Sequence, residues 1–131
     1  MTDPEKTVEK ADKLDSLFEM QAALDRYITE ERHLDFTPAE WIQKRILALL
    51  SELAEVLDEV RFKWWKNTEP IDADALKEEL VDVLHFYIGM CVDAGLSADE
   101  LYEIYLRKNK ENYDRQKGLS DKKGYTLAGY P

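Results

Sequence analysis

Two pairs of carboxylates are the residues of this sequence with the clearest potential for chemistry. Glu52 and Glu55 lie three residues apart, and so do Glu79 and Asp82. Residues at this spacing project from one face of a helix. Two such helices packed side by side would bring four carboxylates together, and hard divalent cations prefer several oxygen ligands held on rigid elements. The four side chains are therefore candidate metal ligands.

Other interpretations of these pairs stay open at this point. The chain has 28 Asp and Glu residues, so acidic pairs at this spacing also arise by chance, and most form solvated helix faces. Glu79 and Asp82 differ because their segment is otherwise apolar, and a buried carboxylate needs a partner or a metal. A lysine or arginine from another helix would serve equally well. Glu55 points away from the apolar stripe of its own helix, so a site there needs cover from another helix or a second subunit.

Four helical segments are predicted to position these residues. Apolar side chains at helical spacing predict helices over residues 5–31, 38–66, 72–95 and 97–118. The start signals are Thr37 as N-cap with Pro38 and a capping-box Glu40, Asp72 or Asp74 for the third helix, and Ser97 for the fourth. The third helix is apolar nearly all round, which is typical of a helix buried in the middle of a bundle, and Gly89 would let a neighbour approach closely.

Composition and length favour one all-α domain, a bundle of four main helices. Residues 1–131 are predicted to form this domain, with 119–131 as an irregular tail. The net charge of −10 argues against a nucleic-acid-binding protein, which would carry a basic patch. No signal peptide or membrane-spanning stretch is recognisable, and the single Cys91 excludes an intrachain disulfide, so we expect a cytoplasmic protein.

Basic and aromatic residues add weaker signals. Lys108, Asn112 and Arg115 share one face of the fourth helix, which suits either a polyphosphate or a solvated helix end. Trp64 and Trp65 are adjacent, so within a helix one is expected in the core while the other offers a flat face for a base or an interface.

Several kinds of site are absent from the sequence. His85, alone on an apolar helix, is more typical of a hydrogen-bonded core residue than of a ligand, and no cysteine or histidine cluster suggests zinc. No P-loop or nucleophile elbow occurs, and Cys91 is expected to be inert core.

The motifs together resemble a known family. SELAE followed by EELVD is similar to the ExxE and ExxD signature of the all-α nucleoside triphosphate pyrophosphohydrolases, which include MazG proteins and dimeric dUTPases. The segments MQAALD, FKWWK, EELVDVLHF and RKNKENYDRQKG followed by GY resemble the dimeric dUTPase branch in particular, over residues 14–125.

This resemblance implies a function and a homodimer. The expected reaction is hydrolysis of dUTP to dUMP and pyrophosphate, dependent on Mg²⁺ with Mn²⁺ as a substitute, with no nucleic acid or membrane partner. The resemblance implies Glu52, Glu55, Glu79 and Asp82 as metal ligands, with Glu52 or Glu55 also activating water. It further implies Lys108, Asn112, Arg115 and Tyr125 as phosphate-binding residues, and Gln21, Trp64 and His85 as base-binding residues.

The base specificity is the least defined part of this interpretation. Some relatives carry an asparagine near the N-terminal glutamine, where this chain reads AALD. A MazG-like hydrolase of broad or different base preference, a binding protein without catalysis, and a helical interaction module whose acidic pairs are surface charge all remain alternatives.

Overall fold

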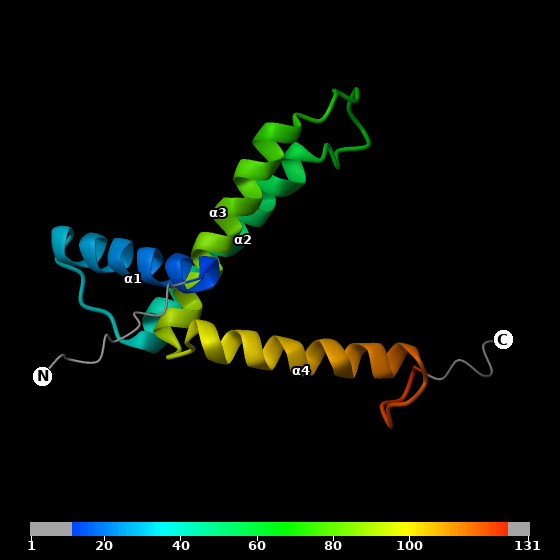
Figure 1. Ribbon diagram of the computed structural model, residues 1–131. Coiled ribbons are helices and arrows are strands. Elements are labelled where there is room, and N and C mark those ends of the chain that lie inside the picture. Colours follow the sequence, from blue (N-terminus) through cyan, green and yellow to red (C-terminus); the bar gives the residue numbers. More distant parts are fainter. Residues whose placement is uncertain (1–11, 126–131) are drawn as a thin grey trace, which may run out of the picture. The chain divides into compact units, whose positions relative to one another are not determined.

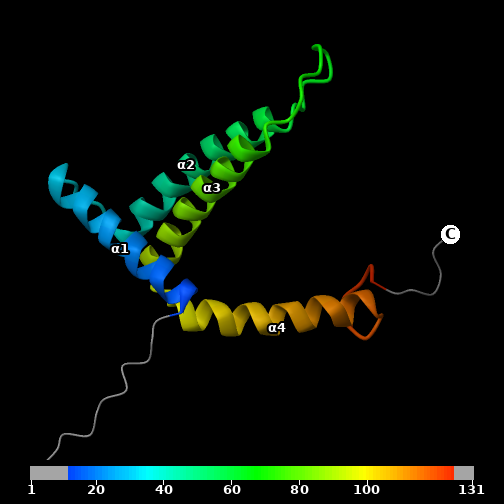
Figure 2. The ribbon, with the colours of Figure 1, turned by 45° about the horizontal axis from the view of Figure 1, so that its top comes forward.

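The protein is all-α, as predicted. The computed structural model describes residues 12–125, and these contain four helices and no strand (Figure 1). The helices are α1 (Lys13–Glu31), α2 (Pro38–Glu59), α3 (Ala73–Asp93) and α4 (Ala98–Gln116). The chain divides into two compact units, Met1–Leu96 with α1 to α3 and Ser97–Pro131 with α4. Within the first unit α2 and α3 run side by side, and α1 contacts α3 (Figures 1 and 2).

Each helix begins at a side-chain cap. Thr37, Asp72 and Ser97 accept hydrogen bonds from backbone N–H groups of the first turn, as predicted, although the reciprocal bond expected from Glu40 is not among those of the described residues. The first helix begins later than predicted, at Lys13, because Asp12 adopts an extended backbone and forms a capping box. The predicted helical residues 5–11 lie outside the described residues.

Each helix ends at a residue with positive φ. Gly95 (φ 74°) and Gly118 (φ 73°) end α3 and α4 near the predicted positions, whereas His33 (φ 53°) and Arg61 (φ 56°) do this after α1 and α2. The prediction that the second helix reaches Lys66 is wrong. The helix stops at Glu59 because the chain turns left-handed at Arg61, a position where no glycine marks the end.

The early end of α2 leaves the tryptophans outside any helix. Trp64 and Trp65 are 85% and 58% exposed, and Trp65 makes edge contacts with both Trp64 and Phe62. The expectation that one of the two tryptophans lies in the core is therefore wrong. It assumed helical geometry, in which adjacent side chains diverge, whereas here the chain is irregular.

The third helix is not buried all round. Its apolar residues Leu80, Val81, Leu84 and Tyr87 are between 41% and 52% exposed, while Ile88, Gly89 and Cys91 are buried. The prediction of a fully buried helix is thus wrong for a single chain, because α3 packs against α2 along one side and against α1 on another, and its remaining face stays open. Burial raises the pKa of the Cys91 thiol, consistent with an inert core cysteine.

A buried arginine joins the three helices of the first unit. Arg45 on α2 is 9% exposed and forms ion pairs with Asp25 on α1, at 3.3 Å, and with Asp93 at the end of α3. Its guanidinium also lies 4.9 Å from the ring centre of Trp41. The expected close approach at Gly89 is confirmed, since a Cβ atom there would lie 3.1 Å from the Arg45 side chain. Glycine therefore makes room for the arginine.

The last described segment is irregular, as predicted. Residues 119–125 contain no helix or strand, and the rest of the expected tail, 126–131, lies outside the described residues. Among the described helices none alone is long and apolar enough to cross a bilayer; only α3 and α4 taken together, across the break between them, reach that length and composition. The expectation of one domain over residues 1–131 stays a prediction.

Replacing Arg45 by methionine tests the ion cluster. Arg45→Met leaves Asp25 and Asp93 without their cation in a mostly buried setting, so we expect the free energy of unfolding at pH 7 to fall by about 3 kcal/mol or more. The control is Lys63→Met, which removes the exposed Lys63–Asp58 pair and should cost at most about 1 kcal/mol. Equal losses in urea titrations of the two variants would contradict the structural role of Arg45.

Candidate functional site

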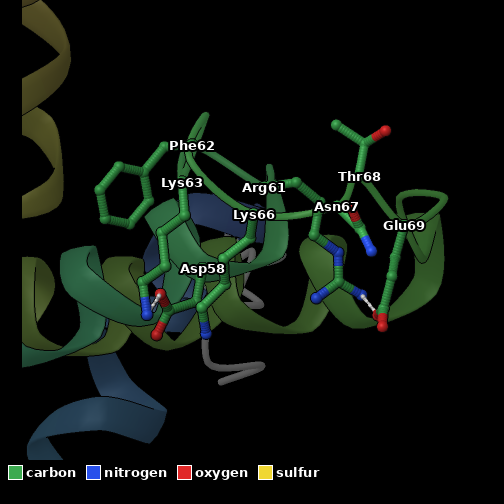
Figure 3. A pocket seen from close by; sticks show the side chains of 8 residues that line it. All are labelled: Asp58, Arg61, Phe62, Lys63, Lys66, Asn67, Thr68 and Glu69. Carbon is green, nitrogen blue, oxygen red and sulfur yellow. Dashed lines mark ion pairs between the residues drawn. The ribbon is translucent and has the colours of Figure 1, made fainter.

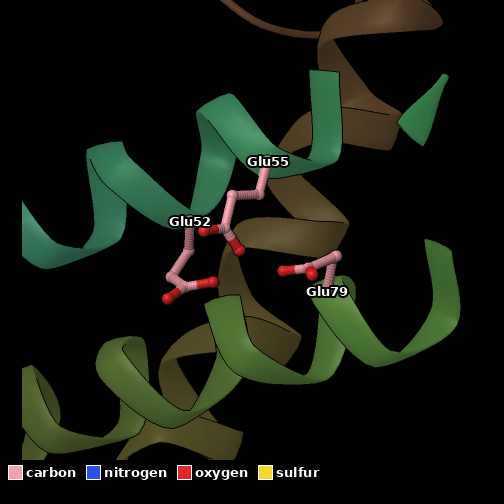
Figure 4. Close-up of side chains that lie close together, drawn as sticks. All are labelled: Glu52, Glu55 and Glu79. Carbon is pink, nitrogen blue, oxygen red and sulfur yellow. The ribbon is translucent and has the colours of Figure 1, made fainter. Parts of the chain in front are cut away.

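The packing of α2 against α3 brings three of the predicted metal ligands together. Glu52 and Glu55 project from α2 toward Glu79 on α3 (Figure 4). One carboxylate oxygen from each lies within 4.8 Å of the others. Glu52 and Glu79 are half-buried, whereas Glu55 is exposed. Glu55 thus lies beside α3 of the same chain but remains exposed, so the cover expected for its helix face stays a prediction.

This concentration of like charge changes the acidity of the site. The hydrogen bond with Glu55, then burial, and then the charges of Glu55, Asp82 and Glu52 raise the pKa of Glu79 from 4.5 to about 7. Burial, followed by the charges of Glu55 and Asp82, also raises the pKa of Glu52. Carboxylates that share a site cannot all ionise freely. The site therefore favours bound protons, or another cation in their place.

Two oxygen atoms of the site show what kind of cation would fit. Oε2 of Glu52 and Oε2 of Glu79 are buried, and neither has a hydrogen-bond partner among the described residues. A buried carboxylate oxygen without a partner is unfavourable, and a divalent cation satisfies several such oxygens at once. The donor set consists of oxygen atoms from rigid helices, which suits Mg²⁺ or Mn²⁺ and not a thiolate-preferring metal. The residues present therefore fit a divalent metal ion.

Asp82, the fourth predicted ligand, lies at the edge of this group. Its charge contributes to the raised pKa of both Glu52 and Glu79, so it is close to them. It is exposed, it does not belong to the cluster of three, and it lines a shallow hollow with Lys77, Glu78 and Val81. A role for Asp82 as a metal ligand stays a prediction.

Two of the three predicted base-binding residues are in contact. Gln21 on α1 and His85 on α3 are joined by a hydrogen bond of 2.7 Å between Gln21 Oε1 and His85 Nδ1. They line a cavity of about 260 Å³ together with apolar side chains, namely Leu17, Met20, Leu24, Val81, Leu84 and Ile88. Trp64 is not among the lining residues, because it follows the end of α2 in the loop that projects away from α1 (Figures 1 and 2).

The predicted phosphate-binding residues lie in the second unit. On α4, Arg115 donates hydrogen bonds to Asn112 at 3.3 Å and to Glu111 at 3.1 Å, and its guanidinium lies 5.8 Å from the ring centre of Tyr125. Its buried Nε has no partner among the described residues. Lys108 is exposed on the same helix. The structure thus groups Asn112, Arg115 and Tyr125 within this unit.

A further hollow lies at the end of α2. Its cavity of about 250 Å³ is lined by Asp58, Arg61, Phe62, Lys63, Lys66, Asn67, Thr68 and Glu69 (Figure 3). Two of its cations are paired, Arg61 with Glu69 at 3.7 Å and Lys63 with Asp58 at 3.8 Å. These pairs are exposed and hold the loop only weakly.

Sequence reasoning did not identify the ion cluster of Arg45, Asp25 and Asp93. A signal for it exists, because Arg45 interrupts the apolar stripe of its helix, three residues after Ile42 and four before Leu49. A charged residue at such a position requires a buried partner.

The acidic cluster predicts an unusual dependence of stability on pH. Glu79 keeps its proton up to about pH 7 in the folded chain but releases it near 4.5 when unfolded. The folded state thus binds more protons in this range, so the free energy of unfolding should fall as the pH rises from about 4.5 to about 7 in EDTA.

Glu79→Gln should remove much of this pH-dependent fall in the free energy of unfolding. The metal-free variant should then be more stable at pH 8 than the wild type. Urea titrations at pH 5 and pH 8 measure this, and Glu78→Gln, at an exposed neighbouring position, is the control. A Glu79→Gln protein that is less stable than wild type at pH 8 in EDTA would contradict the electrostatic argument.

Comparisons with known proteins point to one family. The model of the dUTPase family matches residues 13–93. The dCTP pyrophosphatase of Enterobacteria phage T4 is 32% identical over 87 residues, which are 56% of this chain and 51% of that protein. The dCTP pyrophosphatase of Enterobacteria phage LZ5 is 29% identical over 120 residues, 87% of this chain and 70% of that protein. A DNA replication protein of phage T4 is 31% identical over 81 residues, 51% of this chain and 21% of that protein.

No solved structure matches the chain. The chain spans about half the length of the phage T4 dCTP pyrophosphatase. The family match covers more than half of the chain and includes all of α1, α2 and α3, with both acidic pairs. The sequence, the all-α fold and this match together show that the chain belongs to the dUTPase family.

Proposed function

We propose that this protein is a metal-dependent nucleoside triphosphate pyrophosphohydrolase that converts dUTP to dUMP and pyrophosphate. The observation that carries the proposal is the convergence of Glu52, Glu55 and Glu79 from two helices, with two buried oxygens that lack partners. Surface acidic pairs, as in a non-catalytic interaction module, would be solvated and would not leave buried carboxylate oxygens unsatisfied. Membership of the dUTPase family supports the same assignment.

The acidic residues would bind the metal ion, and one of them would also accept a proton. Glu52, Glu55, Glu79 and Asp82 would hold Mg²⁺, which when bound neutralises charge on phosphoryl oxygens and lowers the pKa of coordinated water. Glu52 or Glu55 would orient the attacking water and accept its proton. The raised pKa of Glu52 makes it a stronger proton acceptor than an ordinary carboxylate, which suits a group that takes up a proton.

The cations of α4 would bind the phosphates that leave. Arg115 offers a planar set of donors, and its buried Nε still lacks a partner among the described residues, so it suits a phosphate oxygen. Lys108 and Asn112 lie on the same helix, and Tyr125 lies against the guanidinium. Gln21 and His85 would contact the base in their cavity, and Trp64, exposed in its loop, would stack on a base.

A dCTP pyrophosphatase is the second candidate. Two of the relatives are named dCTP pyrophosphatase, and cytosine and uracil have the same ring size. The metal chemistry would be identical for both substrates. A MazG-like hydrolase of broad base preference remains the wider alternative.

One experiment separates these functions. The purified protein is incubated with each dNTP, dUTP, dUDP and ribonucleotides, with Mg²⁺, with Mn²⁺ or with EDTA, and the products are separated. We expect metal-dependent release of dUMP and pyrophosphate from dUTP, with the other triphosphates slow. Preferential conversion of dCTP would support the second candidate, and similar rates for several triphosphates would support the broad hydrolase. No turnover of any nucleotide would contradict all three.

The same assay tests the acidic residues. Glu52→Ala and Asp82→Ala should abolish turnover while the far-ultraviolet circular dichroism remains helical, because the metal loses a ligand but the helices keep their caps and packing. Glu78→Ala, at an exposed position beside Glu79, should retain turnover. Retained turnover in both Glu52→Ala and Asp82→Ala would contradict the proposed site.

A homodimer in the cytoplasm completes the proposal. Large apolar side chains remain exposed on α2 and α3, among them Leu47, Leu50 and Val81, and exposed apolar surface favours association.

We therefore expect sedimentation to give twice the chain mass of 15.3 kDa, and Leu47→Glu to shift the protein toward the monomer. Gln43→Glu, one turn earlier at an exposed polar position, is the matched control and should remain dimeric. A wild-type protein that sediments as a monomer at all concentrations would contradict the dimer.

A further inference from the structure

A chain of polar contacts leads from the buried ion cluster to the cavity proposed for the base. Arg45 Nη2 lies 3.3 Å from Asp25 Oδ2. Asp25 Oδ1 accepts a hydrogen bond of 2.8 Å from Gln21 Nε2. The other end of the same amide, Gln21 Oε1, lies 2.7 Å from His85 Nδ1. The contacts therefore run without a break from α2 through α1 to α3.

The chemistry of these groups fixes the direction of each hydrogen bond. An ionised carboxylate only accepts hydrogen bonds, so Gln21 must turn its NH₂ group toward Asp25 and its oxygen toward His85. An amide oxygen also only accepts, so His85 must donate from Nδ1. In a neutral imidazole the other nitrogen, Nε2, is then unprotonated and is an acceptor. Asp25 thus determines, through Gln21, which nitrogen of His85 carries the proton.

The surroundings of Asp25 act on its charge in opposite directions, and its geometry is that of an acceptor, since Gln21 Nε2 donates to its Oδ1. Burial of the half-buried side chain, with the charge of Asp93, raises the pKa of Asp25 above its ordinary value, although the hydrogen bond from Gln21 and the charge of Arg45 act in the opposite direction. The Arg45 guanidinium is itself held by Asp93 and packs over Gly89. Because the guanidinium is fixed from three sides, Asp25 has little freedom to rotate away from Gln21.

The cavity beside His85 has the size and character of a base-binding site. Its volume of about 260 Å³ is bounded by apolar side chains, with Gln21 and His85 as its polar lining. Nε2 of His85 forms no hydrogen bond with any residue in 12–125. An acceptor beside an apolar cavity recognises an N–H donor on the edge of a flat ring, and it disfavours an acceptor at the same place.

We propose that Asp25, anchored by Arg45, is a positioning residue that sets the base preference of the enzyme by holding His85 in the Nδ1–H form. The ligand class is a pyrimidine nucleotide that presents an N–H donor to Nε2. Uracil and cytosine differ in donors and acceptors along one edge, since uracil carries N3–H and O4 where cytosine carries an unprotonated N3 and a 4-amino group. An acceptor fixed opposite ring position 3 therefore favours uracil, and one fixed opposite position 4 favours cytosine, whereas an imidazole free to exchange tautomers would serve both edges. This inference rests on the proposed function.

Asp25→Asn removes the fixed direction of the hydrogen bonds from Asp25 through Gln21 to His85, with little change in the shape of the side chain. An asparagine both donates and accepts, so Gln21 is free to flip and His85 to move its proton to Nε2. Asp93→Asn is the matched control, because Asp93 contacts the same Arg45 but not Gln21. If Asp25 only stabilised the fold, the two substitutions would have the same effect, because each alters one carboxylate partner of Arg45.

The first readout is independent of turnover. The ring ¹⁵N signals of His85, in protein labelled at its two histidines and assigned with His33→Gln, report the tautomer directly. We expect the Nδ1–H form in the wild type and in Asp93→Asn, and a substantial Nε2–H population in Asp25→Asn. An Nε2–H form in the wild type overturns the proposal, as does an unchanged Nδ1–H form in Asp25→Asn.

The second readout is the ratio of kcat/KM for dUTP to that for dCTP. We expect this ratio to move toward one by about tenfold in Asp25→Asn, chiefly through KM, and to stay within about twofold of wild type in Asp93→Asn. An unchanged ratio in Asp25→Asn overturns the specificity role. If the wild type cleaves no nucleotide, the proposed function fails and the specificity role falls with it, while the ring signals still decide whether Asp25 positions His85.

Discussion

The contact between Arg45 and Gly89 is the constraint on which the arrangement of the first unit depends. The guanidinium lies where a side chain on residue 89 would otherwise lie, and Asp25 and Asp93 hold it there from two other directions. The helices α2 and α3 run antiparallel (Figures 1 and 2), so this one pairing sets their register. Seven residues after Arg45 and seven before Gly89 stand Glu52 and Asp82, and three further along each helix stand Glu55 and Glu79. Because a shift of seven residues nearly restores the same helix face, Glu52, Glu55 and Glu79 fall at the α2–α3 contact, with Asp82 at its edge.

The sequence predicted those features that depend on local chemistry. Caps at Thr37, Asp72 and Ser97 and glycine ends at Gly95 and Gly118 follow from side chains within one turn of the helix end, and the structure agrees with them. The meeting of Glu52 and Glu55 with Glu79 could also be anticipated, because i,i+3 spacing fixes a face once two helices pack.

Features that depend on distant partners or on an unmarked turn could not be predicted in the same way. No glycine marks the turn at Arg61 that ends α2, so the sequence pattern predicts a helix that continues through Trp64 and Trp65. In the structure these two residues lie in an irregular loop. The open face of α3 also could not be foreseen, because periodicity shows that a surface is apolar but not which element covers it. The residues Asp25, Arg45 and Asp93 carry no motif, and only their proximity in space reveals them.

The two charged clusters of the unit illustrate opposite uses of burial. Around Arg45 one cation forms ion pairs with two carboxylates, so each carboxylate has a positive partner within the chain. Around Glu52, Glu55 and Glu79 no cation of the described chain compensates the carboxylates, and the pKa of Glu79 rises to about 7 as a result. Since an isolated fold would be more stable without that repulsion, the acidic cluster makes physical sense as a site that receives its positive charge from outside. The ion cluster of Arg45 then supplies the rigidity that the acidic cluster lacks. The helix register that it fixes keeps the three glutamates together when their repulsion would separate them.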